Sequence, residues 1–263
     1  MIQRAHVIGM GRLGRPLALR LESLGVNTER WSRTASEGVH PLSAWETAGD
    51  GEALFLAVPD DALAAVVAQV LPGIGPNTLL VHHAGAVPAE ILQVAPEQRG
   101  VLWPPMTFVA EQAPNWNTLP LGVETDNEAL RQWSRQLAPN AFDLTSETRQ
   151  ALHLGAVLAG NLTAAWLGTV EAHLTEHGLP LEVLAPLVQE SVATALKGKA
   201  LNSVSGPAAR NDRSTLDRQQ ATLAQGSAAA PDLPLLHHIL TNCILQHHGY
   251  DRLPPFQATA EAH

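Results

Sequence analysis

The chain has 263 residues, of which 45% are hydrophobic and 16% charged, and its formal net charge is −9. This composition is too apolar for a disordered chain, and an acidic balance without a cluster of Lys and Arg argues against nucleic-acid binding. A chain of this length can bury a core without disulfides, as one large domain or two modest ones.

The first half of the chain alternates short strand-like runs with helical patterns. Strand-like runs lie at residues 5–8, 26–31, 53–58, 78–81, 100–103 and 119–123, and helical patterns lie at residues 14–24, 61–71 and 128–137. This alternation is typical of a parallel sheet with crossover helices. We therefore predict an α/β fold over residues 1–145, a doubly wound and mostly parallel sheet of the Rossmann type.

A glycine motif directly follows the first predicted strand. The segment Gly9-Met10-Gly11-Arg12-Leu13-Gly14 has the spacing GxGxxG and leads into the first helix. In such a loop the first glycine permits a tight turn, the second lets the backbone approach a pyrophosphate, and the third lets helix and strand pack closely. The helix N-terminus favours the anion. Because the motif lies within a βαβ unit, it predicts a nicotinamide-dinucleotide site.

The end of the second predicted strand indicates the preferred cofactor. A fold that binds NAD is expected to carry an acidic residue there, whereas this chain has Ser32, Arg33 and Thr34. A guanidinium between two hydroxyls suits a 2′-phosphate, because it can donate two charge-assisted hydrogen bonds. We predict NADP, with NAD as the alternative because of Glu29, and a solvated surface position is the other interpretation of Arg33.

Two further loops follow predicted strands at the edge where doubly wound sheets bind ligands. Ala57, Val58 and Pro59 follow the third strand, and we expect their backbone to flank the cofactor. His82 and His83 close the fourth strand. Successive strand residues face opposite ways, so only one of these histidines can easily point into the crevice.

From residue 146 onward the strand-like runs disappear. Helical patterns cover residues 146–177, 181–200, 214–225 and 233–248. We therefore predict a second, all-helical domain over residues 146–263, which we expect to bind the substrate and to form a dimer interface.

Residues 151–170 are apolar nearly all round and about as long as a membrane-spanning helix. His153 and Asn161 lie within this stretch and would be costly in lipid, so we expect no membrane contact. An all-round apolar helix needs a cover, and its small residues permit close approach of another backbone. We therefore expect a homodimer through the helical domain. A monomer in which the sheet and the later helices cover this helix is the alternative.

Three polar side chains of the helical domain are candidates for substrate contacts. His153 and Asn161 are eight residues apart on one helix, about 80° of arc, so they can border one cleft. Polar groups on an apolar helix need a partner or a ligand. Arg210 could clamp a substrate carboxylate, or pair with Asp212 or across the dimer interface.

The remaining cysteine and histidines point to no metal site. His237-His238 and His247-His248 are adjacent pairs without the spacing of a zinc site. Cys243 is the single cysteine, which excludes an intramolecular disulfide and indicates a reducing compartment. It lies in an apolar run, so we expect a buried thiol. The first residues lack the apolar core of a signal peptide, and we expect a cytoplasmic protein.

The whole chain resembles a family of two-domain proteins that pair a Rossmann-like domain with a helical domain of unknown function, DUF2520. Its fold is similar to that of pyrroline-5-carboxylate reductase, ketopantoate reductase and the β-hydroxyacid dehydrogenases. The resemblance is carried by residues 9–16, 56–61 and 82–86, by the pair His153 and Asn161, and by residues 205–212.

The resemblance implies roles for several residues. It selects His82 as the functional histidine of its pair, and it implies that His153 donates a proton while Asn161 orients the substrate. The chain also departs from the family pattern. Ala84 stands where the family usually has Ser, and Trp103 stands where it tends to have His. In the segment 205–212, Asn211 replaces a glycine.

Together these features predict an NADP-preferring oxidoreductase that transfers hydride to or from a small carbonyl, imine or hydroxy acid. The alternative is an NADP(H)-binding sensor or regulatory protein without turnover, which the apolar Ala84 and Trp103 favour.

Overall fold

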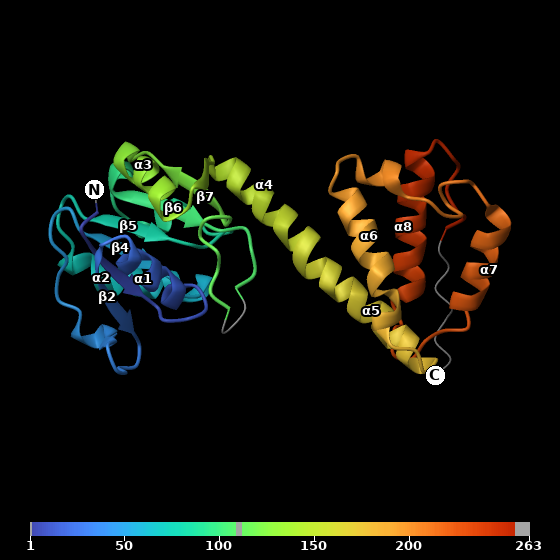
Figure 1. Cartoon of the computed structure of the whole chain (residues 1–263), viewed down its shortest axis with the longest axis horizontal. Helices are drawn as coiled ribbons and strands as arrows, with labels where there is room; N and C mark the ends of the chain where they lie inside the picture. The colour runs from blue at the N-terminus through green and yellow to red at the C-terminus, as the bar shows by residue number, and fades with distance from the viewer. Residues whose placement is uncertain (1, 109–111, 256–263) are drawn as a thin grey trace. The chain divides into compact units, whose positions relative to one another are not determined.

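The computed structural model describes residues 2–108 and 112–255. Within them eight strands form one sheet in the order β3-β2-β1-β4-β5-β6-β7-β8 (Figure 1). Every neighbouring pair is parallel except β6 and β7. The strands are β1 (Arg4–Ile8), β2 (Asn27–Ser32), β3 (His40–Pro41), β4 (Ala53–Leu56), β5 (Leu79–His82), β6 (Arg99–Trp103), β7 (Pro120–Thr125) and β8 (Asn140–Asp143).

The predicted mostly parallel α/β sheet followed by a helical region is confirmed. Two of the strands, β3 and β8, were not predicted. The first has only two residues, and the second has no fully buried side chain, so neither shows the apolar run that marks a strand in the sequence.

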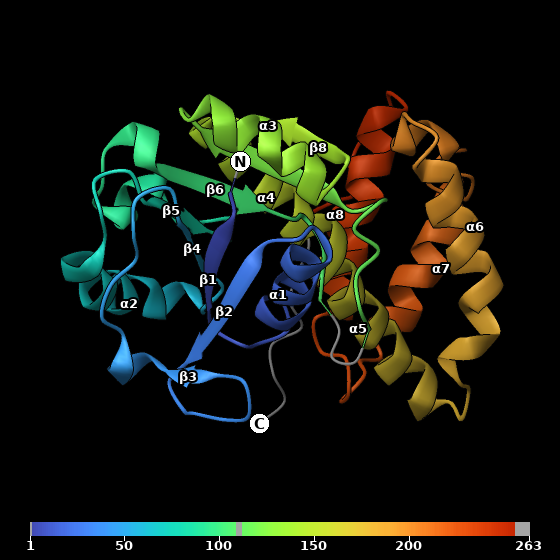
Figure 2. The ribbon, with the colours of Figure 1, turned by 60° about the vertical axis from the view of Figure 1, so that its left-hand side comes forward.

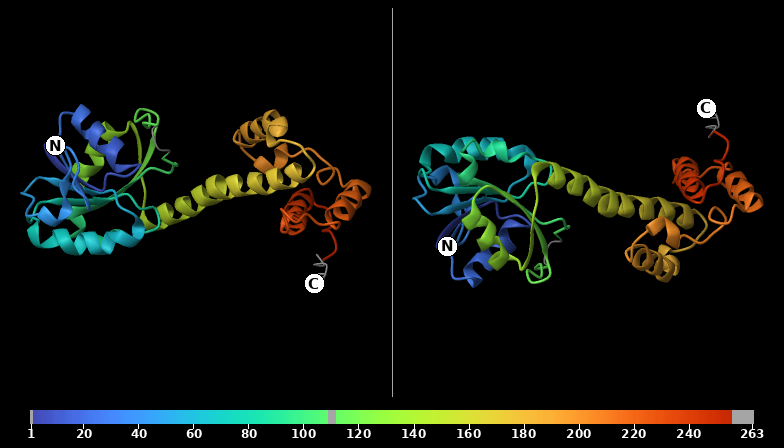
Figure 3. Two further views of the ribbon diagram at one scale, coloured as in Figure 1. Left: turned by 90° about the horizontal axis from the view of Figure 1, so that it is seen from below. Right: turned by 90° about the horizontal axis from the view of Figure 1, so that it is seen from above.

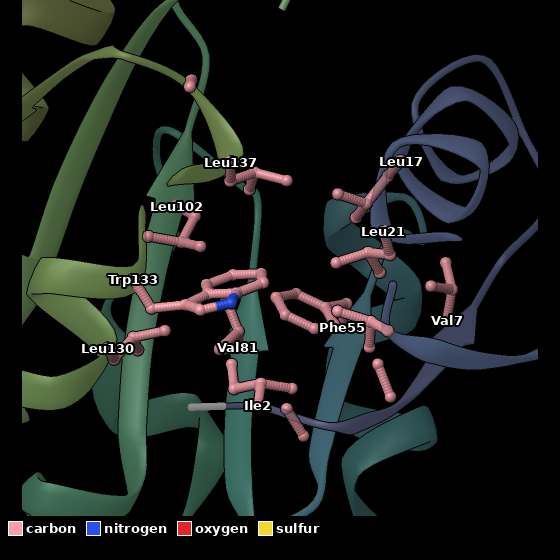
Figure 4. Packing of buried hydrophobic residues seen from close by; sticks show 14 of the residues in the cluster. Ile2, Val7, Leu17, Leu21, Phe55, Val81, Leu102, Leu130, Trp133 and Leu137 are labelled. Atoms are coloured by element: carbon pink, nitrogen blue, oxygen red, sulfur yellow. The ribbon is translucent and has the colours of Figure 1, made fainter. Parts of the chain in front are cut away.

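Helices cover both faces of the sheet. α1 (Gly14–Ser23) and α3 (Glu128–Leu137) pack on one face, and α2 (Leu63–Val70) packs on the other (Figures 2 and 3). On the first face the rings of Phe55 and Trp133 lie 5.8 Å apart, beside Leu17 and Leu21 of α1 (Figure 4). On the second face Leu54 packs in a separate cluster with residues of α2. All four side chains of β4 are buried, because successive residues alternate between two covered faces.

One continuous helix leads from the sheet into the helical region. It comprises α4 (Ser146–Ala156), a π-turn (Val157–Asn161) and α5 (Leu162–Glu176). Thr145 and Thr148 form a capping box at its start, which satisfies two otherwise free N–H groups. The helix is long and apolar enough to cross a membrane by length and composition, and none of its most apolar window is buried within the chain.

The chain divides into two compact units, Met1–Ala159 and Gly160–His263. The sequence placed the division at residue 145, where the predicted strands end. The units divide later because α4 packs on the sheet: Arg149 binds Glu124 of β7, and Ala156 packs against Trp103 of β6.

The second unit contains α5, α6 (Ala185–Ala195), α7 (Arg213–Leu223) and α8 (Leu233–His247). Its buried core is small and contains Ala208, Leu216, Leu245 and Leu253. The prediction of a buried Cys243 is wrong for the single chain, because the thiol lies on an exposed face of α8. An apolar run does not reveal which of its members face the core of so thin a helical unit.

Candidate functional site

The glycine loop after β1 contains three glycines, and at one of them, Gly11, the surrounding atoms would leave room for a side chain. Gly9 has a φ of 101°, and a Cβ there would lie 2.4 Å from the carbonyl oxygen of Ala57. A Cβ on Gly14 would lie 1.7 Å from the carbonyl oxygen of Gly9. In contrast, a Cβ on Gly11 would meet nothing within 4 Å. Gly9 and Gly14 are thus required for packing, whereas Gly11 leaves open space where a dinucleotide fold brings the pyrophosphate.

The other residues of the loop also fit an anion. The carbonyl of Met10 accepts a hydrogen bond of 2.9 Å from Arg15 Nε, which orders the loop. Leu13 precedes α1 without a side-chain cap, and the first turn holds no acidic residue. The N–H of Arg15 donates to the carbonyl of Gly11 at 3.3 Å, and Pro16 has no N–H, so within the described residues the N–H of Gly14 is the group of this turn that is left for a phosphate. Arg12 is exposed and has no hydrogen-bond or ion-pair partner among the described residues. The loop therefore offers an exposed guanidinium and a backbone N–H to an anion.

An arginine without a partner among the described residues, Arg33, directly follows β2. Ser32 Oγ accepts from the backbone N–H of Thr34 at 3.2 Å and donates to its carbonyl at 2.8 Å, which forms a tight turn. Arg33 lies at the tip of this turn, exposed, and across residues 2–108 and 112–255 nothing pairs with its guanidinium. Glu29, which kept NAD as an alternative, is instead paired with Arg4 and lies 3.3 Å from His6.

The loop after β4 lies against the glycine loop. The N–H of Ala57 donates to the carbonyl of Ile8 at 2.8 Å, and the N–H of Gly9 donates to the carbonyl of Trp31 at 2.8 Å. A Cβ on Gly9 would also lie 2.9 Å from Val58 Cγ1. The loops after β1, β2 and β4, with Pro59 at the end of the last, therefore meet at one edge of the sheet, as the sequence predicts for a cofactor site.

The two histidines at the end of β5 are both neutral. His82 is fully buried, and its Nδ1 accepts from the N–H of Ala84 at 3.2 Å. Burial lowers the pKa of His82 to about 3, the nearby basic side chains of His83 and Arg149 add to this effect because they oppose a second positive charge, and the weaker effect of the Pro88 carbonyl opposes it. His83 donates from Nδ1 to the carbonyl of Leu102 at 2.6 Å, and burial lowers its pKa to about 4. At neutral pH neither ring carries the charge of an imidazolium acid.

His153 lies against the turn that follows β5. Its ring packs edge-on to Trp103, with the ring centroids 5.5 Å apart. A Cβ on Gly85 would lie 2.4 Å from His153 Nδ1 and 2.8 Å from the indole of Trp103. Only glycine at position 85 therefore permits this contact between the turn, β6 and α4. His153 Nδ1 is buried and has no hydrogen-bond partner in the part of the chain that the structure describes.

Arg149 is part of this constellation and was not predicted. Its side chain is fully buried, and Nε donates to Glu124 Oε2 at 2.6 Å. Nη1 donates to the carbonyls of Ala84 and Gly85. In the sequence an arginine on a helix reads as a solvated residue, and its position four residues before His153 is the only signal that could have identified it.

Two predicted residues lie in the second unit. Asn161 ends the π-turn, a helix irregularity that often accompanies functional sites, and it is exposed. Arg210 is also exposed and unpaired within the described residues. Asp212, the partner that the sequence offers for Arg210, instead caps α7 by accepting from the N–H of Thr215 at 3.1 Å. Asn211 has a φ of 57°, a left-handed backbone conformation that glycine adopts without strain.

A pocket of about 570 Å³ lies at the opposite edge of the sheet, at the start of β6 and the end of β7. Its arginines are already paired, Arg99 with Glu90 at 2.6 Å and Arg131 with Asp143 at 2.8 Å. We do not assign the cofactor to it, because dinucleotides bind at the carboxyl edge of such sheets. Residues 2–108 and 112–255 contain no group of three or more His, Cys, Asp or Glu side chains placed to hold a metal ion.

Residues 119–242 match the family model described as "Domain of unknown function (DUF2520)". No curated protein sequence matches the chain. A Bacteroides fragilis protein with the provisional name NADP oxidoreductase is 23% identical, with a TM-score of 0.76, over 93% of this chain and 98% of that one. A Thermotoga maritima protein is 19% identical, with a TM-score of 0.67, over 93% and 99%.

An imine reductase from Aspergillus terreus, solved with NADPH4 and a dibenzazepine, is 16% identical. Its TM-score is 0.59, over 95% of this chain and 97% of that one. At such identities the likeness shows the fold, which this chain shares with NAD(P)-binding oxidoreductases of the Rossmann type.

Proposed function

We propose that this chain, which carries a DUF2520 domain over residues 119–242, is an NADP-preferring oxidoreductase that acts on a small carbonyl, imine or hydroxy acid. Two neighbouring features carry the proposal: Gly11 leaves open space beside α1, and Arg33 at the end of the neighbouring strand has an exposed guanidinium without a partner among the described residues. The first suits a pyrophosphate and the second a 2′-phosphate. The Bacteroides fragilis protein with the provisional name NADP oxidoreductase and the solved imine reductase have the same fold, which supports this choice of cofactor and reaction class.

Different loops of the first unit bind different parts of the cofactor. The backbone of Gly9–Gly14 and the N-terminus of α1 hold the pyrophosphate, and Ser32, Arg33 and Thr34 hold the 2′-phosphate. The backbone of residues 57–59 flanks the nicotinamide half. When bound, NADPH supplies or accepts the hydride, which is chemistry that no side chain provides.

His153 is the group that we assign to proton transfer. The edge-on contact with Trp103 and the close approach to Gly85 hold its ring, as a positioned acid requires. His82 is neutral and fully buried, so a structural role in the turn suits it better than proton donation. Orientation of the substrate by Asn161 and clamping of a carboxylate by Arg210 stay predictions.

NADPH oxidation, followed by absorbance across a panel of small carbonyls and imines, tests the reaction. Arg33→Asp tests the cofactor, because it replaces the phosphate partner with a repelling charge. We expect NADPH affinity to fall roughly ten- to a hundredfold, the worth of a charge-assisted contact of ~1.5–3 kcal/mol, with little change for NADH. The matched control, Arg218→Asp of the second unit, is expected to change neither affinity. Equal losses for both cofactors with Arg33→Asp would refute the 2′-phosphate assignment.

A sensor without turnover is the second candidate. Ala84 and Trp103 are both buried. The resemblance implies that the family usually has Ser at the first position and tends to have His at the second, so both changes remove a polar group. Tight NADPH binding with no turnover across the whole panel would establish the sensor and reject the enzyme.

A homodimer is part of the proposal. Leu154, Leu158 and Leu162 follow one another at helical spacing and are 58%, 53% and 51% exposed. Gly155 and Gly160 lie between them, and a Cβ on either would meet nothing within 4 Å. A continuous apolar face of this kind favours a protein partner, and a second copy of the same helix fits it by close backbone approach. The cytoplasmic location indicated by the lone cysteine stays a prediction.

A further inference from the structure

Burial of Arg149 costs desolvation free energy that its contacts are not expected to offset. Its side chain is 0% exposed, and that of Glu124 is 15% exposed. Desolvation of such a pair costs several kcal/mol per ion, and well-packed apolar residues of similar volume often stabilise a fold as well or better. In addition, Nη2 of Arg149 is buried without a hydrogen-bond partner among the described residues. A purely structural role therefore does not account for an arginine at this position.

Two of the contacts of Arg149 meet at one turn, and the third is the ion pair with Glu124 of β7. Nη1 donates to the carbonyls of both Ala84 and Gly85, while Glu124 holds the guanidinium through Nε. The N–H of the same Ala84 donates to His82 Nδ1, and Gly85 is the residue against which His153 and Trp103 pack. A planar guanidinium can hold a carboxylate and two carbonyls at once in a fixed geometry, which an ammonium cannot do.

Arg149 and His153 lie on the same face of α4. They are four residues apart within the regular helix Ser146–Ala156, so their side chains are neighbours on the helix surface. Arg149 thus binds α4 to the turn after β5, and His153, about one helical turn later, contacts the same turn.

We propose that Arg149, held by Glu124, is a positioning residue that fixes the Ala84–Gly85 turn and thereby sets His153 against Trp103. Its role in turnover rests on the proposed function. Its role in placing the His153 ring does not.

Two variants separate positioning from stability. Arg149→Lys keeps the charge but loses the forked contact. The double variant Arg149→Met with Glu124→Leu replaces the ion pair by apolar side chains, so that no charge is left buried alone. Arg135→Lys, at an exposed arginine of α3, is the matched control. The measurements are the unfolding temperature, the Kd for NADPH, kcat and KM, and the titration of the His153 ring by NMR, assigned with His153→Gln.

We expect the folded double variant to bind NADPH as the wild type does, because no contact of Arg149 involves the glycine loop. Its kcat should fall by up to about 10²-fold, the loss that a displacement of about 1 Å in a reacting group can cause. The midpoint of the His153 titration should move in the double variant and in Arg149→Lys, and stay unchanged in the control.

An unchanged kcat and an unchanged His153 titration in a folded variant would overturn the proposal. So would a parallel loss of NADPH affinity, which would mean general damage to the fold. If the wild-type protein itself turns over no substrate, the proposed function fails, and the His153 titration alone then decides the positioning role.

Discussion

Two glycines of one loop are expected to respond in opposite ways to substitution. The change is Gly11→Val in one variant and Gly14→Ala in the other. A Cβ on Gly11 meets nothing within 4 Å, whereas a Cβ on Gly14 would lie 1.7 Å from the carbonyl oxygen of Gly9, an atom of the backbone that cannot rotate away. The first variant therefore tests the ligand, and the second tests the fold.

The magnitudes follow from these contacts. Gly11→Val is an exposed change without a clash, and should alter the stability of the free protein by no more than about 0.5 kcal/mol. Gly14→Ala should cost roughly 1–3 kcal/mol, as overpacking typically does. NADPH at a hundred times its Kd should stabilise the wild-type protein by about 2.7 kcal/mol. With about 2–4 °C per kcal/mol for a domain of this size, this is a rise of roughly 5–11 °C in the unfolding temperature.

Thermal unfolding with and without NADPH measures both effects. We expect Gly11→Val to unfold at the wild-type temperature and to show no shift with NADPH, because the isopropyl group occupies the space of the pyrophosphate. Gly14→Ala should unfold at a lower temperature even without ligand. A full NADPH shift in Gly11→Val would show that no pyrophosphate approaches this loop, and wild-type stability of Gly14→Ala would refute the steric argument.

Three further outcomes are expected. Light scattering at micromolar concentration should give a dimer of the 28.0 kDa chain, and Leu158→Glu, which places a charge on the apolar helix face, should give a monomer; a wild-type monomer that binds NADPH would contradict the dimer. Asn211→Gly should leave stability unchanged or raise it while Asn211→Val lowers it, because the φ of 57° disfavours a β-branched side chain, and urea denaturation that fails to distinguish the two would contradict this reasoning. Burial lowers the pKa of His82 to about 3 and that of His83 to about 4, from the ordinary 6.5. Below pH 6.5 the unfolded chain therefore binds more protons than the folded one. The free energy of unfolding should decrease as the pH is lowered, by up to about 2.7 kcal/mol per pH unit near pH 5. In the double variant His82→Gln with His83→Gln, the free energy of unfolding measured by urea denaturation should depend less steeply on pH than in the wild type. An equal pH dependence would count against this assignment.

The proposed cofactor half of the site can be predicted from the sequence because its signals are local. The spacing of Gly9, Gly11 and Gly14 prescribes a backbone conformation within six residues, and Arg33 directly follows the second strand. Alternation of strand and helix patterns predicts the sheet, because the period of apolar residues reports directly on local backbone geometry. The structure places these residues at one edge as the pattern requires.

Other features were decided only by tertiary packing. The salt bridge between Arg149 and Glu124 joins residues that are 25 positions apart, and the closeness of Gly85, Trp103 and His153 joins three separate elements. The exposure of Cys243 depends on which helix faces pack together. A sequence specifies which side chains a helix or strand presents, but the partner that each side chain meets depends on how those elements dock. For this protein the sequence determined the fold class and the cofactor motif, and docking of α4 on the sheet decided which residues surround His153.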